Sequence, residues 1–226
     1  MPARPNRRTA FWLTLMLAAA AVATAAALLQ WVGLHRASKP LVMLFAIIFV
    51  AGRADLAGAD GRFRWLLMAA LACSMAGDAL LMFDGLFLPG LVAFLLAHLA
   101  YLALFARGLP WLPSRAATLL VALLGVGMYA FLWQGGLPAG LRVPVALYVL
   151  AMGLMVAQAG GRATRLRDGP AWRVALGAGL FMLSDSLLAT NRFVQPLPLA
   201  PLWVLGSYFI AQILIAACAR PASARG

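Results

Sequence analysis

The sequence has 226 residues, of which 65% are hydrophobic and only 11% are charged. A soluble globular chain is nearer about half apolar and about a quarter charged, so this composition excludes that class and indicates an all-α, polytopic membrane protein. The net charge of +12 does not indicate a nucleic-acid partner, because the arginines are spread between the apolar runs instead of gathering on one face with aromatic residues.

The apolar runs predict eight membrane-spanning helices of roughly 20 residues each. The first run, 11–29, follows Arg7 and Arg8 as a signal peptide would, but its length favours an uncleaved span. The second run, 40–51, is short, and it places Pro40 at a helix start, where proline costs no backbone hydrogen bond. The remaining runs are 63–83, 87–105, 116–133, 143–159, 172–190 and 199–219.

Positive charges divide unequally between the two sides of such an eight-helix bundle. Arg36, Lys39, Arg142 and Arg192 fall on one side, and all other Lys and Arg residues fall on the opposite side. Since cytoplasmic loops carry the excess of Lys and Arg, both termini are predicted to face the cytoplasm. The Ala, Gly and Arg bias is typical of a high-GC bacterium, so we expect a bacterial inner-membrane protein.

One constant offset relates the two halves of the chain without a gap. It pairs identical residues: Trp65 with Trp172, Met75 with Met182, Asp78 with Asp185, Pro89 with Pro196 and Tyr101 with Tyr208. We interpret this register as an internal duplication. Because the offset spans four helices, an even number, it predicts two parallel four-helix repeats, approximately 11–107 and 116–219, within a single domain spanning 1–226. Such repeats are related by an axis along the membrane normal.

Asp78 and Asp185 are the leading functional candidates. Each lies near the end of an apolar run and between small residues. An Asp at the centre of a spanning helix costs about 2.5–3.5 kcal/mol to insert, so it faces the bundle interior and marks either a functional site or a structural ion pair. If the repeats pack about a twofold axis, the two carboxylates converge on one cavity. One would then be the protonated acid and the other the ionised base, an arrangement that suits ether hydrolysis or a proton relay.

Other polar residues of the spans have less specific readings. Lys39, the only lysine, is expected at the outer mouth of the second span, as a snorkelling cation, a phosphate anchor or the charge partner of an Asp. His98 shares a helix face with Tyr101, and it breaks the repeat because its counterpart is a leucine. The remaining polar residues are expected to join helices or to anchor at the interface, and they are Tyr101, Tyr148, Asn191, Tyr208 and Gln212.

Several common site types are not indicated. The two histidines, His35 and His98, form no HExxH motif, and Cys73 and Cys218 form no pair of metal ligands. The sequence also has no Walker A motif, no Gly-x-Ser-x-Gly elbow and no dinucleotide fingerprint. We therefore expect neither a metal nor an organic cofactor.

Short motifs recur in order from the second to the eighth run: Lys39-Pro40-Leu41, Gly77-Asp78-Ala79-Leu80-Leu81, the segments 94–101 and 177–189, and Tyr208-Phe209-Ile210-Ala211-Gln212. As an ordered set they resemble the YhhN-like, or lysoplasmalogenase, family. The resemblance implies an eight-helix membrane enzyme that hydrolyses the vinyl ether bond of lysoplasmalogens to a fatty aldehyde and glycerophospho-ethanolamine or -choline. It also implies a set of candidate site residues: Lys39, Asp78, His98, Tyr101, Asp185 and Asn191.

A mechanism follows as a hypothesis. One of Asp78 and Asp185 would protonate the vinyl ether, and the other would stabilise the oxocarbenium ion and activate water, as carboxyl pairs do in glycoside cleavage. His98 and Tyr101 would orient a carboxylate or the water.

Lys39, with Asn191 and Tyr208, is expected to bind the lipid. The expected partner is thus a lysoplasmalogen or related ether lysolipid in the bilayer. Two other functions fit the same residues. Paired intramembrane carboxylates in parallel repeats are equally natural in a small proton-coupled transporter. A non-catalytic lipid-binding membrane protein is the third reading.

Overall fold

The computed structural model describes residues 7–56 and 61–222. Over these residues the chain forms eight α-helices and no β-strand, and every helix is long and apolar enough to cross a membrane. They are α1 (Arg7–Leu28), α2 (Val32–Ala51), α3 (Gly61–Leu81), α4 (Phe87–Ala106), α5 (Arg115–Gln134), α6 (Arg142–Leu166), α7 (Gly169–Phe193) and α8 (Ala200–Cys218). The predicted all-α polytopic bundle is confirmed. Arg4 and Arg225, which enter the predicted charge asymmetry, lie outside the described residues.

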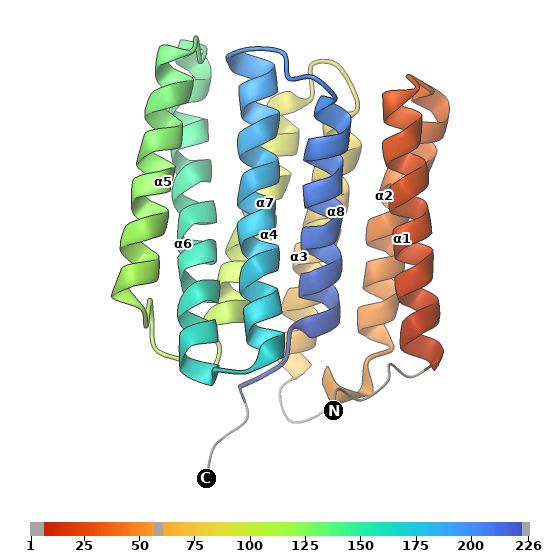
Figure 1. Ribbon diagram of the computed structural model, residues 1–226, viewed down its shortest axis with the longest axis vertical. Coiled ribbons are helices and arrows are strands. Elements are labelled where there is room, and N and C mark those ends of the chain that lie inside the picture. Colours follow the sequence, from red (N-terminus) through yellow and green to blue (C-terminus); the bar gives the residue numbers. More distant parts are fainter. Residues whose placement is uncertain (1–6, 57–60, 223–226) are drawn as a thin grey trace.

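The helices lie side by side along one direction (Figure 1). In this view α1 and α2 form one edge of the bundle and α5 and α6 the other, while α7 and α8 lie in front of α3 and α4. The chain enters α1 and leaves α8 at the same end of the bundle, as an even number of spans requires. Short 3-10 turns, Ala54–Leu56 and Ala139–Leu141, precede α3 and α6.

The packing of the first four helices recurs in the second four. The helix α1 packs on α2 as α5 packs on α6, α2 packs on α3 as α6 on α7, and α3 packs on α4 as α7 on α8. Between the halves, α4 packs on α6 and α8 packs on α2. In both contacts the last helix of one half meets the second helix of the other. The edges differ, because α1 also contacts α8 whereas α5 contacts α7. These neighbours are the ones that two parallel repeats would have, and the duplication itself stays a prediction.

The helix α2 is longer than the sequence suggested. It begins at Val32 and holds Pro40 in its interior, so the prediction that Pro40 starts the helix was wrong. An interior proline removes one backbone hydrogen bond, yet membrane helices tolerate it because neighbouring helices and Ser side chains satisfy the backbone. Pro40 frees the carbonyl of Arg36, while the Ser38 hydroxyl donates to a different carbonyl, that of Leu34, at 2.6 Å. As a result Lys39 lies about two turns inside α2 and is buried, instead of lying at the helix mouth.

The helix α6 also extends past its predicted end. Arg162, expected in a loop, is helical and buried. Its guanidinium donates to the carbonyl oxygens of Phe105, Arg107 and Arg220 at 3.2, 3.0 and 2.7 Å. Those carbonyls lie where α4 ends and just beyond α8, at positions that lack an intrahelical partner. Arg162 therefore ties three helix ends together on one side of the bundle.

Candidate active site

One polar cavity lies between α2, α3, α7 and α8, in the half of the bundle where α2 and α8 begin. It holds about 820 Å³ of empty space, including its opening. Its polar lining consists of His35, Lys39, Asp78, Ser184, Asp185, Asn191 and Tyr208. Asp78 and Asp185, one from each half of the chain, therefore line the same cavity.

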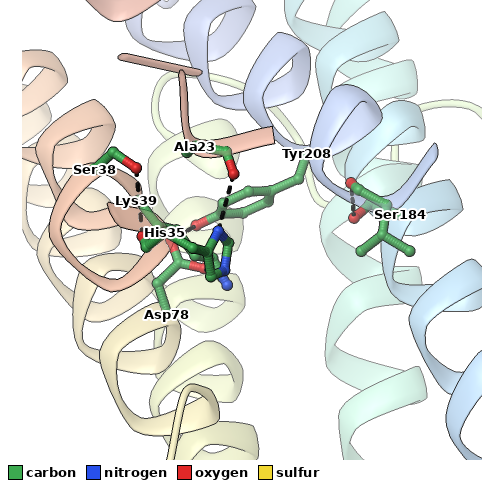
Figure 2. Close-up of polar contacts among 8 residues, drawn as sticks. Ala23, His35, Ser38, Lys39, Asp78, Ser184 and Tyr208 are labelled. Carbon is green, nitrogen blue, oxygen red and sulfur yellow. Dashed lines mark hydrogen bonds and ion pairs between the residues drawn. The ribbon is translucent and has the colours of Figure 1, made fainter. Parts of the chain in front are cut away.

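Asp78 is almost fully buried and has two polar partners. The Lys39 ammonium lies 3.0 Å from Oδ1, and the Tyr208 hydroxyl donates to Oδ2 at 2.7 Å. Figure 2 shows both side chains, together with His35, gathered around this carboxylate. The His35 Nδ1 lies 2.9 Å from the Ala23 carbonyl oxygen, which can only accept, so Nδ1 carries a proton.

The residue before Asp78 allows a close helix contact. A Cβ on Gly77 would lie 2.5 Å from the Phe94 ring, so only glycine lets α4 approach α3 at this level. In the second half Ser184 takes the corresponding place, and its hydroxyl donates to the Val204 carbonyl oxygen at 2.9 Å (Figure 2). The small residues beside both carboxylates therefore bring a neighbouring helix close.

Asp185 has different partners. The Tyr148 hydroxyl donates to Oδ2 at 2.5 Å. The His98 Nε2 lies 3.7 Å from the same oxygen, which is longer than a hydrogen bond. The His98 ring is fully buried against Tyr148 and Phe181, with ring centroids 4.9 and 4.8 Å away, and neither ring nitrogen has a hydrogen-bond partner within the described part of the chain.

The two carboxylates receive their partners from equivalent helices. Each is contacted by the second helix of its own half, through Lys39 on α2 for the first carboxylate and Tyr148 on α6 for the second. Each is also approached by the last helix of the opposite half, through Tyr208 on α8 and His98 on α4 respectively. The positions of the two carboxylates are thus alike, but their partners differ in chemistry. Asp78 has an ammonium and a phenol, and Asp185 has a phenol and an imidazole.

Two of the predicted site residues have other contacts. Tyr101 donates to the Gln212 side-chain oxygen at 2.6 Å, and it is not among the described residues that line the cavity. Asn191 does line the cavity, but its Oδ1 accepts from the Leu197 backbone N–H at 2.8 Å and so also holds the α7–α8 connection.

Sequence reasoning missed two residues of the site. Tyr148 was expected only to join helices or to anchor at the membrane interface, and His35 was weighed only as a metal ligand. The repeat gave only a partial signal for Tyr148, because α6 is the counterpart of α2 but the constant offset pairs Lys39 with Ala146 and not with Tyr148. In the described residues, no group of three or more His, Cys, Asp or Glu side chains is placed to bind a metal ion.

Comparison with known proteins places this geometry in a family. Residues 34–219 match the model of the YhhN family. The lysoplasmalogenase TMEM86B of Homo sapiens is 36% identical over 175 residues, which cover 77% of this chain and 72% of that protein. The protein of the same name from Sus scrofa is 39% identical over 186 residues, 82% of this chain and 74% of that protein.

A bacterial relative matches as well. The lysoplasmalogenase of Mycobacterium tuberculosis is 35% identical over 166 residues, which cover 70% of this chain and 61% of that protein. No solved structure matches this chain. Since the family model spans the cavity-lining residues of both halves, from His35 to Tyr208, this chain belongs to the YhhN family.

Proposed function

We propose that this chain is a lysoplasmalogenase, which hydrolyses the vinyl ether bond of a lysoplasmalogen to a fatty aldehyde and glycerophospho-ethanolamine or -choline. The observation that carries the proposal is that Asp78 and Asp185 line one cavity with chemically different partners. The names of the relatives support the substrate class.

The reaction needs one acid and one water. Protonation of the alkene carbon remote from oxygen forms a C–H bond with the π electrons and leaves an oxocarbenium ion. Water adds to that cation and loses a proton, giving a hemiacetal. The hemiacetal then collapses: its hydroxyl proton leaves, the bond to the glycerol oxygen breaks, and that oxygen takes up a proton. One water is consumed, and the products are the aldehyde and the glycerol hydroxyl.

We assign the proton donor to Asp185 and the stabilising carboxylate to Asp78. The ammonium of Lys39 compensates a negative charge on Asp78, so this carboxylate stays ionised although it is buried. The described partners of Asp185, a phenol and an imidazole, do not bring the fixed positive charge that Lys39 brings to Asp78, so partial burial favours its neutral form. In other hydrolases, different environments give two carboxyl groups different protonation states, so that one acts as the acid and the other as the base.

Tyr148 and His98 serve as positioning residues in this proposal. The Tyr148 hydroxyl holds Oδ2 of Asp185, which leaves Oδ1 for the substrate. The His98 Nε2 lies 3.7 Å from Oδ2, so a small shift of the ring would bring the imidazole within hydrogen-bond distance of the carboxyl. His98 lines neither of the two cavities that Asp185 lines, so in this proposal it acts through Asp185, whose carboxyl it orients.

Lys39 and Asn191 have separate tasks. Lys39 acts as the charge partner of Asp78 instead of the phosphate anchor considered from sequence. Asn191 uses its Oδ1 for Leu197, so its amide N–H groups remain for the polar end of the lipid. We also propose, from the loop charges, that both ends of the chain face the cytoplasm in a bacterial inner membrane, so that the cavity lies toward the opposite leaflet.

Aldehyde release tests the function directly. The purified protein in detergent, with no ion gradient, is given a vinyl-ether lysolipid or the matching saturated-ether lysolipid. We expect aldehyde from the vinyl ether alone. Absence of aldehyde, together with proton-driven uptake of a solute in sealed vesicles, would replace the hydrolase by the transporter.

A further inference from the structure

A second cavity lies beside the polar one, and Asp185 lines both. This second cavity, which we call the apolar cavity, is bounded by α4, α5, α6 and α7 and holds about 620 Å³ of empty space. Its walls are mainly hydrocarbon, from side chains such as Leu91, Met128, Val149 and Met152. An apolar space beside a candidate catalytic acid is suited by its chemistry to a hydrocarbon ligand.

The two cavities adjoin at the level of Asp185. Leu81, Phe94 and Leu188 also line both of them, so the same side chains form the boundary. On one side of the boundary lie the charged and polar groups around Asp78, and on the other side lie aliphatic and aromatic side chains. A lysoplasmalogen has the same order of parts, with a polar glycerophospho head, then the vinyl ether, then a hydrocarbon chain.

We propose that the apolar cavity binds the hydrocarbon chain of the substrate, with the polar head in the polar cavity and the vinyl ether at Asp185. This inference rests on the lysoplasmalogenase function proposed above. It also bears on the choice of acid, because the carboxyl at the boundary is the one that meets the bond between head and chain. Asp78 lines only the polar cavity of the two.

The apolar cavity continues into a groove on the flank of the bundle, between α5, α6 and α7. Met128, Val149, Met152 and Ser186 line both spaces. The groove also contains Gly127 and Gly179, where an added Cβ would meet no atom within 4 Å. These glycines therefore leave free space and are not needed for close helix packing, in contrast to Gly77.

The helix α5 forms the outer wall of this groove. It is the least buried of the eight spans. Of the 18 consecutive residues that form its most apolar stretch, 11% are buried, against 28–39% in the other spans. Few contacts hold such a helix, so it is the wall that yields most easily to a lipid chain. A chain longer than the apolar cavity thus has a path from Asp185 through the groove to the bilayer.

Substitutions that fill these spaces test the inference. Ala189 lines the apolar cavity and Gly179 lines the groove, so Ala189→Leu and Gly179→Leu shorten the space for the chain. Gly206→Leu is the matched control, because Gly206 is also a half-buried helical glycine with no atom within 4 Å of an added Cβ, and it lines neither space. The assay is aldehyde release from hexadecenyl and octenyl lysolipids that share one head group.

We expect Ala189→Leu to lower kcat/KM for the hexadecenyl substrate about tenfold or more relative to the octenyl substrate, since one methylene in an apolar pocket changes selectivity by about 10–200-fold. Gly179→Leu changes the ratio in the same direction, and Gly206→Leu keeps the wild-type ratio. A wild-type ratio in both filling variants, in an enzyme that releases aldehyde, overturns the chain assignment and leaves the hydrolase function standing.

Failure of the underlying function gives a different result. If the wild-type protein releases aldehyde from neither substrate, binding of the saturated hexadecyl lysolipid, followed by tryptophan fluorescence, replaces the rate. Weaker binding to Ala189→Leu than to Gly206→Leu supports the apolar cavity as the chain site. Equal binding to the two variants overturns it.

Discussion

Lys39 on α2 and Asp78 on α3 form an ion pair of 3.0 Å, and only 11% and 2% of their side chains are exposed. Two charges so placed depend on each other, because removal of either leaves the other buried without compensation. The pair also fixes the relative position of α2 and α3 at the level of the cavity. It therefore connects the stability of the bundle with the charge that we assign to the active site.

Replacing one member of this pair should destabilise the bundle more than replacing both. Lys39→Met leaves an unpaired buried carboxylate, for which we expect a loss of about 3–5 kcal/mol, whereas Lys39→Met combined with Asp78→Asn recovers most of it. Thermal unfolding in detergent measures the difference, with Arg36→Met as a control at an exposed cation. Equal losses in the single and double variants would contradict the role of Lys39 as a charge partner.

Each carboxyl should be needed for aldehyde release. Asp185→Asn and Asp78→Asn keep the shape and remove the acid or base, so we expect losses of about a hundredfold or more, within the range of general acid–base catalysis. Asp84→Asn, at an exposed carboxylate in the α3–α4 connection, is the control. Full activity in either active-site variant removes that residue from the mechanism.

Among the tyrosines, Tyr148 should matter more than Tyr101. Tyr148→Phe deletes the hydroxyl that holds Asp185 and keeps the ring, so we expect kcat to fall about tenfold, or about 1.4 kcal/mol. Tyr101→Phe removes a hydrogen bond to Gln212 and should lower the melting temperature more than the rate. Tyr129→Phe, which loses a hydrogen bond to the Arg142 carbonyl oxygen, serves as the control. A larger loss of rate in Tyr101→Phe would restore the assignment made from sequence.

His98→Leu should separate stability from activity. The imidazole is buried without a hydrogen-bond partner among the described residues, and such a group is costly, so an apolar side chain should leave stability unchanged or raise it. If His98 orients the Asp185 carboxyl, aldehyde release should nevertheless fall about tenfold or more. Unfolding and rate are measured on the same preparation. A variant that unfolds earlier while its remaining folded fraction keeps the wild-type rate would indicate a purely structural histidine.

At the other end of the bundle, Asp55 should make stability depend on acid pH. Partial burial alone would raise the pKa of Asp55, but the hydrogen bonds and charge of Arg53 outweigh it, so the pKa lies below its usual range. The unfolded chain then binds the proton more readily. The contribution of the Asp55 carboxylate to the free energy of unfolding is therefore complete above the unfolded pKa, and it is lost as the pH falls through the folded pKa.

The comparison of wild type with Asp55→Asn tests this point. Their unfolding temperatures should differ near neutral pH. The difference should shrink below about pH 4, and it should vanish once the pH falls below the folded pKa of Asp55, where the carboxyl is protonated in both states. A constant difference across that range would mean that the substitution acts through something other than the charge of Asp55.

Much of the fold could be predicted from hydrophobicity alone. Spans in lipid must satisfy their backbone internally, so long apolar runs become helices, and all eight were found. The start of α2 and the end of α6 could not be predicted in this way. Proline is unfavourable in the interior of an isolated helix, and an arginine as buried as Arg162 is unfavourable without partners. Contacts from other helices make these positions tolerable, and a local sequence pattern does not contain them.

The site was predictable to a similar degree. The repeat and the cost of a buried charge identified Asp78 and Asp185, because both signals are present in the chain itself. The choice between Tyr101 and Tyr148 depended on which helix faces α7, and this is a property of tertiary packing. The pairing of Lys39 with Asp78 was one of three open readings, since its depth in the membrane depended on where α2 begins.

The equivalence of the two carboxylate positions has a consequence for how such a site can arise. A symmetric dimer of identical four-helix chains would hold two carboxylates at one axis, but symmetry would give both the same neighbours and therefore the same charge state on average. Joining the halves in one polypeptide lifts that constraint, since each copy then accepts its own substitutions. Lys39 beside Asp78 and Tyr148 beside Asp185 are differences of this kind. Fixed, different surroundings for the two acids are thus possible in a single chain or in a heterodimer, but not in a symmetric homodimer.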